Sequence, residues 1–136
     1  MKHLKIFSYA LFGVLVLFVS CTYNQQRKID EKEFCRNLNS FVNALDDLAV
    51  ASEGNDYNAF YKAYEKAEKE WNRLVESAER LEDIQMEQSV NEYNKLVTKI
   101  NKITADPDNP AVDYEIDDNI QKTADKIADI QTTVCD

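Results

Sequence analysis

Apolar residues recur at steps of three and four along most of this chain, and this spacing predicts four amphipathic α-helices. The first runs over about residues 29–51, with a stripe formed by Phe34, Leu38, Phe41, Leu45 and Leu48. The second runs over about residues 56–81. Its predicted inner face consists of Tyr57, Tyr61, Tyr64, Trp71, Leu74, Val75 and Ala78, with Phe60 beside it. Aromatic rows at helical spacing belong to cores more often than to ligand sites, so we expect a core face here.

The third and fourth helices carry the same kind of pattern. The third stripe contains Val90, Tyr93, Val97, Ile100 and Ile103. The fourth helix, over about residues 112–134, alternates steps of four and three through Ile116, Ile120, Thr123, Ile127, Ile130 and Val134. Such an alternation is a heptad seam. A fully buried seam would be core, whereas an exposed part would favour packing against a partner or a second copy.

Two of the three breaks between these helices carry turn residues. The stretch "SEGND" at 52–56 ends the first helix, with Gly54 as the expected stop and Asn55 or Asp56 as the cap of the second. The stretch "DPDNP" at 106–110 contains two prolines, which disfavour helix.

The break between the second and third helices has neither Gly nor Pro. The apolar stripe loses phase between Ile84 and Val90, so we predict a turn at about residues 83–88. The stretch "SVNE" then has the form of a capping box, in which Ser89 would cap the third helix and Glu92 would reach back to it. At the start of the first helix, Asp30 and Glu31 would lie in the first turn, where negative charge suits the helix dipole.

The N-terminal segment reads as an export signal. Lys2 and Lys5 precede an uncharged apolar run that extends from Ile6 to Val19 and is short for a spanning helix. An uncleaved membrane anchor is the alternative. The run ends in "FVSC", residues Phe18 to Cys21. This ending resembles the lipobox of bacterial lipoproteins, although leucine is commoner where Phe18 stands.

The resemblance to bacterial lipoproteins implies attachment of lipid to the Cys21 sulfur and cleavage just before it. It covers only residues 1–21. We therefore divide the chain into a signal peptide at 1–20, a lipidated tether at 21–28 and a helical domain at 29–136. Several acyl chains on one cysteine would make a stable anchor, whereas one chain binds a bilayer only marginally.

The two other cysteines bear on the topology. Cys35 lies near the start of the first helix and Cys135 at the end of the last. In an up-down bundle these points share one end only if the number of helices is even; three helices of about 20 residues would separate them by roughly 30 Å. A disulfide requires Cα atoms within about 7 Å, and export permits one. We therefore predict an all-α, up-down four-helix bundle with a Cys35–Cys135 disulfide; two buried free thiols are the alternative.

The composition argues against several functions. Without residues 1–20 the net charge of −9 becomes −11, and the chain then has no histidine and a single glycine, Gly54. An acidic surface repels nucleic acid. The lack of histidine removes the usual nucleophile systems and imidazole ligands, and one glycine cannot build a phosphate-binding loop. We therefore expect no enzyme and no cofactor.

The acidic stretch "DPDNPAVDYEIDD" gives the one weak indication of a metal. Asp106, Asp108 and Asp113 are the candidate ligands for calcium. An EF-hand loop starting at Asp106 would need glycine where Ala111 stands and glutamate where Asp117 stands. The simpler interpretation is an acidic turn followed by an acidic helix start.

Taken together, these features predict a lipid-anchored protein of the bacterial cell envelope. Thr22 does not match the aspartate-type retention signal known from enterobacteria, so the outer membrane is favoured over the inner membrane. The predicted function is a non-catalytic protein-binding module for a basic partner, in one version an immunity or inhibitor protein. The alternative is a structural or assembly component of an envelope complex.

Overall fold

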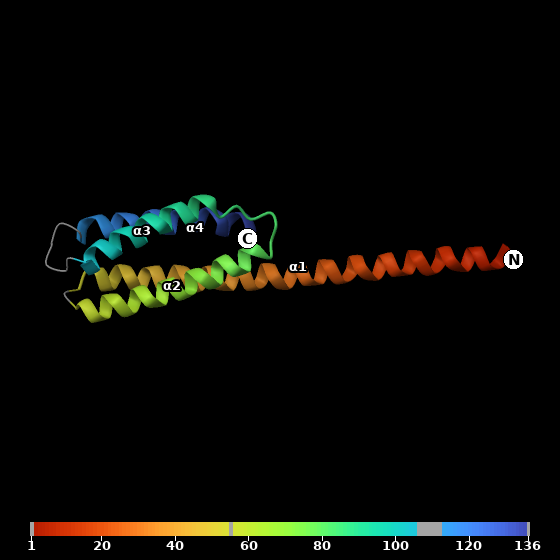
Figure 1. Cartoon of the computed structure of the whole chain (residues 1–136), viewed down its shortest axis with the longest axis horizontal. Helices are drawn as coiled ribbons and strands as arrows, with labels where there is room; N and C mark the ends of the chain where they lie inside the picture. Colours follow the sequence, from red (N-terminus) through yellow and green to blue (C-terminus); the bar gives the residue numbers. More distant parts are fainter. Residues whose placement is uncertain (1, 55, 106–112, 136) are drawn as a thin grey trace.

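The computed structural model describes residues 2–54, 56–105 and 113–135, and it describes the side chains of residues 22–54, 56–104 and 116–135. The described residues form four α-helices: α1 (Lys2–Ser52), α2 (Tyr57–Glu79), α3 (Glu87–Ala105) and α4 (Asp113–Val134). They run up and down in a bundle, and α1 continues well past it toward the N-terminus (Figure 1). The predicted all-α, four-helix fold is confirmed.

The apolar stripe of α1 forms the centre of the core. All five predicted residues, Phe34, Leu38, Phe41, Leu45 and Leu48, are at most 1% exposed. From the other helices, Leu74, Leu96, Ile100, Ile116 and Ile127 are equally well buried. Burying apolar side chains of this size stabilises a fold by about 1.5–3 kcal/mol each. This shared burial holds the four helices together.

The helices do not pack equally closely. α1 packs against α2 and α4, and α3 packs against α4, whereas no described Cα atoms of α2 and α3 come within 8 Å of each other. Large rings fill the space between α2 and α3. Trp71 stacks on Tyr93 with ring centroids 4.3 Å apart, and Phe41 lies 5.1 Å from Trp71 and 5.7 Å from Tyr93. Aromatic pairs at such distances add about 0.5–1.5 kcal/mol beyond their buried area.

The helix ends agree with the sequence in part. The Asp56 carboxylate accepts hydrogen bonds from the backbone N–H groups of Asn58 and Ala59, so the predicted cap of α2 is confirmed. The predicted break before α3 is also present, at residues 80–86. The capping box is wrong, because α3 already begins at Glu87 and Ser89 is 1% exposed within the helix. Packing of Ser89 against the bundle outweighed its preference for a helix end.

The start of the first helix differs from the prediction. α1 does not begin near Ile29 but includes residues 22–28, so Asp30 lies inside the helix rather than in its first turn. Asp30 is 8% exposed. Its carboxylate accepts a hydrogen bond from Gln26 and lies 4.0 Å from the Arg80 guanidinium. The helix continues here because residues 22–29 contain neither Gly nor Pro to stop it.

A disulfide between Cys35 and Cys135 joins the first and last helices. The Cα atoms lie 5.7 Å apart although the residues are 100 positions apart in sequence. Both cysteines are partly buried against the core. The topological argument for an even number of helices therefore led to the correct pairing.

Candidate functional site

Two tyrosines expected in the core lie on the surface instead. Tyr57 is 45% and Tyr61 is 42% exposed, whereas Phe60 and Tyr64 on the same helix are buried. The prediction that Tyr57 and Tyr61 belong to the inner face is therefore wrong. Both lie in the first turns of α2, and no described Cα atom of α3 comes within 8 Å of this helix.

The exposed side chains form an ordered pair, which we call the tyrosine pair. The rings of Tyr57 and Tyr61 are stacked, with centroids 6.5 Å apart and planes 20° apart. Tyr61 also meets Tyr64 edge-on at 6.4 Å. Tyr64 is 8% exposed, and its burial and the charge of Glu68 raise the pKa of its hydroxyl. The tyrosine pair thus packs against the buried ring of Tyr64.

The tyrosine pair lies at one end of the bundle. It lies in the first turns of α2, at the end of the bundle opposite to the N-terminal extension of α1 (Figure 1). Asp56 caps the helix directly before it. At the same end, the Ser52 hydroxyl donates a hydrogen bond to Asp117 at 2.6 Å, which connects the end of α1 to α4. The tyrosine pair therefore lies at an end of the bundle where hydrogen bonds cap α2 and join α1 to α4.

Chemically, an exposed tyrosine pair is suited to recognition. Tyrosine supplies a rigid apolar ring and a polar hydroxyl, and it is enriched among the residues that dominate binding energy at protein interfaces. The pattern of the sequence gives no direct sign of this exposure.

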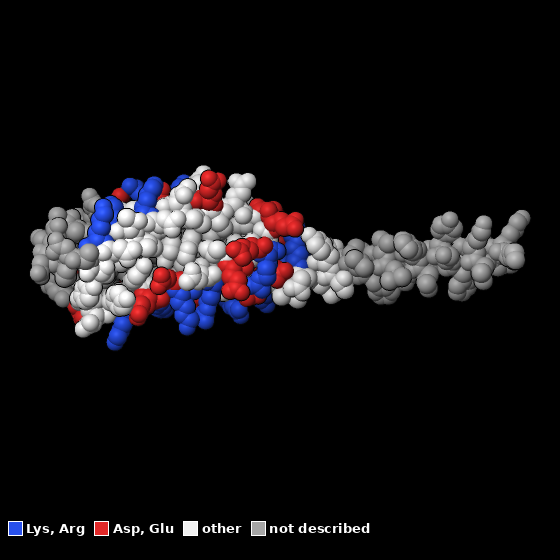
Figure 2. All heavy atoms as spheres, in the orientation of Figure 1, with Lys and Arg blue, Asp and Glu red and all other residues white. Residues whose placement is uncertain are grey.

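The outer face of α2 carries a second feature that the overall acidity of the sequence obscured. Lys62, Lys66, Lys69, Arg73 and Arg80 form one row at steps of four, three, four and seven. Figure 2 shows basic side chains along the lower edge of the molecule, where α2 lies in Figure 1. Three of these five have carboxylate partners: Lys66 with Asp47 at 2.6 Å, Arg73 with Glu70 at 3.1 Å and Arg80 with Glu33 at 3.1 Å.

A polar groove of about 460 Å³ lies beside this row, between α1 and α2. Its charged residues are balanced, with Arg36, Arg73 and Arg80 against Glu33, Glu70 and Glu76. Arg80 donates a hydrogen bond to Glu33 and lowers the pKa of that carboxyl. Because the cations are offset by neighbouring anions, this groove does not favour an anionic ligand.

The other predicted site residues fall largely outside the described part of the structure. The side chain of Cys21 lies outside it, and so do those of Asp106, Asp108 and Asp113. Within the described residues, no three His, Cys, Asp or Glu side chains are placed so that they could hold a metal ion. No helix in the described part combines the length and apolar composition that a bilayer crossing requires.

The heptad seam of α4 is buried over most of its length. Ile116, Ile120, Thr123 and Ile127 are at most 5% exposed, but Ile130 and Val134 are only partly buried.

Comparison of the chain with protein-family models, curated proteins and solved structures found no match.

Proposed function

We propose that this protein is a lipid-anchored protein of the bacterial cell envelope that works as a non-catalytic protein-binding module. The observation that carries the proposal is the tyrosine pair, because binding energy at protein interfaces concentrates in aromatic side chains such as these two stacked, half-exposed rings. The lipobox-like stretch that ends in Cys21 supports the anchor. The outer membrane remains the favoured location, on the basis of Thr22.

The geometry of α1 suits display of the tyrosine pair away from a bilayer. The helix is continuous from residue 22 to residue 52, which corresponds to about 45 Å at 1.5 Å per residue. Arg27 binds Glu31 at 2.9 Å on its own helix and Asp83 at 2.7 Å in the segment before α3. An anchor at Cys21 would thus lead into a helical spacer attached to the bundle, with the tyrosine pair at the far end.

The charge of the chain favours a basic partner. The net charge is −11 without residues 1–20, and long-range attraction between opposite charges accelerates association. A tyrosine pair within an acidic molecule therefore matches a basic protein that also offers an apolar surface. An immunity or inhibitor protein that neutralises a basic toxin or hydrolase in the envelope is the concrete version of this proposal.

A second candidate function is a structural or assembly component. It is favoured by the incomplete burial of Ile130 and Val134, since an uncovered part of a helix seam is available to a partner. The two candidates involve opposite ends of the bundle, so one set of variants can distinguish them.

Site-specific photocrosslinking in the native envelope tests the binding function. A photoreactive phenylalanine analogue replaces Tyr61 in the full-length protein, and a second variant carries the same analogue at Ile29. Ile29 is 58% exposed and lies near the other end of the bundle, so it is a matched control. We expect one basic protein to be crosslinked from position 61 only, with a yield that falls as salt increases.

A substitution then links the crosslink to the tyrosine pair. Tyr57→Ser, introduced beside the probe at position 61, is expected to reduce the yield, whereas Ile29→Ser is expected to leave it unchanged. Equal crosslinking from positions 29 and 61 would refute the proposal, as would products that contain only a second copy of the chain. Incorporation of labelled palmitate, and its loss in Cys21→Ser, tests the anchor separately.

A further inference from the structure

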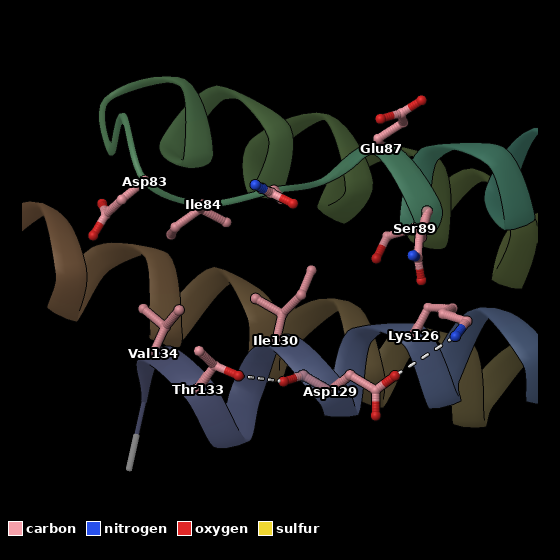
Figure 3. Close-up of a pocket in the computed structure, with 11 residues that line it drawn as sticks. Asp83, Ile84, Glu87, Ser89, Lys126, Asp129, Ile130, Thr133 and Val134 are labelled. Atoms are coloured by element: carbon pink, nitrogen blue, oxygen red, sulfur yellow. Dashed lines mark hydrogen bonds and ion pairs between the residues drawn. The ribbon is translucent and has the colours of Figure 1, made fainter.

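A groove of about 370 Å³ lies beside the C-terminal turns of α4, at the end of the bundle opposite to the tyrosine pair. Its apolar part is made by Ile84, Ile130 and Val134, all of which are partly buried. In Figure 3, Ile84 points down from the segment before α3, and Ile130 and Val134 point up toward it from α4. The volume lies in the range of pockets that hold ligands, about 300–1,000 Å³.

The groove exists because α4 extends past the beginning of α3. α3 starts only at Glu87, and Ser89 lies level with Lys126 (Figure 3). Beyond this point α4 continues to Val134, and α3 no longer covers its seam, although α1 still packs against α4. The connecting segment 80–86 crosses here instead and contributes one aliphatic side chain, that of Ile84. The heptad seam therefore ends in an apolar surface that is not covered on the side of α3.

The rim of the groove is mainly acidic. Asp83, Glu87 and Asp129 line it together with one lysine, Lys126. Asp83 is engaged by Arg27 at 2.7 Å, and Asp129 lies 3.7 Å from Lys126, with a side chain that is 75% exposed. Ion pairs this exposed contribute little energy and rearrange easily. Carboxylates at the rim thus remain available to cations from outside.

We propose that this groove, referred to below as the α4 groove, docks a cationic amphipathic segment of another protein. Aliphatic side chains of that segment would continue the seam over Ile130 and Val134, and its Lys or Arg side chains would meet the carboxylates of the rim. Helices that lay an apolar face into a groove are an established mode of recognition. The complementary charge follows from the carboxylates around the apolar floor, which still outnumber the cations when Lys126 and the Arg27 bound to Asp83 are both counted.

The same charges argue against the other occupants. A second copy of the chain would bring a net charge of −9 or −11 against an acidic rim, and like charges across an interface are unfavourable. Anionic lipid headgroups would be repelled for the same reason. The α4 groove is independent of the proposed anchor and of the tyrosine pair, so its failure leaves the photocrosslinking result at Tyr61 unaffected.

Methyl NMR on the oxidised protein with a designed peptide tests this inference. The peptide has about 14 residues, with leucine on one helical face and lysine elsewhere. Two control peptides have the same composition in an order without an apolar face, or glutamate in place of lysine. We expect the designed peptide to shift the methyl signals of Ile84, Ile130 and Val134 and to leave that of Val50 unchanged. Val50 is 73% exposed on α1 and reports nonspecific binding.

Variants of the α4 groove complete the test. Ile130→Ser with Val134→Ser should weaken binding of the designed peptide about tenfold, since two aliphatic contacts are lost. Glu87→Gln with Asp129→Asn leaves the apolar floor intact. This variant should bind the designed peptide more weakly, and its affinity should depend less on salt. Val50→Ser should change neither the affinity nor its salt dependence. Equal binding of the unordered peptide, or shifts spread over the surface without the three methyl groups, would overturn the inference. Shifts of these methyl groups with protein concentration alone would instead assign the groove to a second copy.

Discussion

Removal of the Cys35–Cys135 disulfide should lower the stability of this protein more than most single core substitutions. The bridge joins residues 100 positions apart. In the chain-entropy model, a loop of about 100 residues that is closed in the unfolded state accounts for about 4.7 kcal/mol. The free energy of unfolding of a small domain is only about 5–15 kcal/mol. The bridge therefore supplies about a third of the total at the upper end of this range and most of it at the lower end.

The packing around the bridge determines what remains after its removal. α1 and α4 still pack against each other without it, since Leu38, Phe41 and Ile127 are fully buried. We therefore expect the variant Cys35→Ser/Cys135→Ser to stay helical but to lose about 3–5 kcal/mol. At about 4–8 °C per kcal/mol for a domain of this size, the melting temperature should fall by about 12–40 °C.

Urea unfolding followed by far-ultraviolet circular dichroism measures this loss. The oxidised protein, the reduced protein and the double serine variant are compared, because the reduced protein separates loss of the bridge from any effect of serine. The slope of the free energy against urea should rise without the bridge, since an unlinked unfolded chain exposes more surface. A loss below about 1 kcal/mol in a two-state transition would refute the entropic argument.

Three further substitutions test the packing, the cap and a buried hydroxyl. Phe41→Ala removes a fully buried ring that contacts Trp71 and Tyr93 and should cost about 3–5 kcal/mol in urea unfolding, whereas Val50→Ala should stay within about 0.5 kcal/mol. Asp56→Ala removes the side chain that accepts two backbone hydrogen bonds at the start of α2 and should cost about 1 kcal/mol; an unchanged midpoint would contradict the role of this cap. The Tyr93 hydroxyl has no hydrogen-bond partner among the described residues, and burial raises its pKa well above the ordinary value of 10. Above pH 10 the unfolded state thus releases the Tyr93 proton, whereas the folded state retains it. The contribution of this hydroxyl to the free energy of unfolding is therefore fully present below pH 10. It is lost as the pH rises above 10, by up to about 1.4 kcal/mol per pH unit. Tyr93→Phe should make this alkaline loss less steep without loss of stability at neutral pH, and equal slopes for the two proteins would contradict the assignment.

The periodicity of the sequence was sufficient for most of the fold. The stripe of α1, the cap at Asp56 and the break before α3 all follow from residues close together in the chain. The disulfide followed from a count of helices rather than from any local motif. These features depend on the direction in which a side chain leaves its own helix and on residues that stop a helix, and both are local properties.

The sequence was less informative about helix starts and about the candidate sites. Ser89 has the local features of a cap, but it is buried inside α3. The residues at 22–28 lack apolar periodicity but continue α1, because nothing in them ends a helix and Arg27 connects them to Asp83. In both places, contacts with distant parts of the chain decided between local alternatives of similar energy.

By itself, then, the sequence determined where helices form, which face of each is apolar and that their number is even. Only the tertiary structure decided which apolar residues are covered. Tyr57 and Tyr61 stay about half exposed on the same helix that buries Phe60 and Tyr64, and the backbones of α2 and α3 remain apart. Ile130 stays partly exposed because α3 begins too late to cover the end of α4. The direction of a side chain is a property of its own helix, but its burial depends on the distance and length of the neighbouring helix.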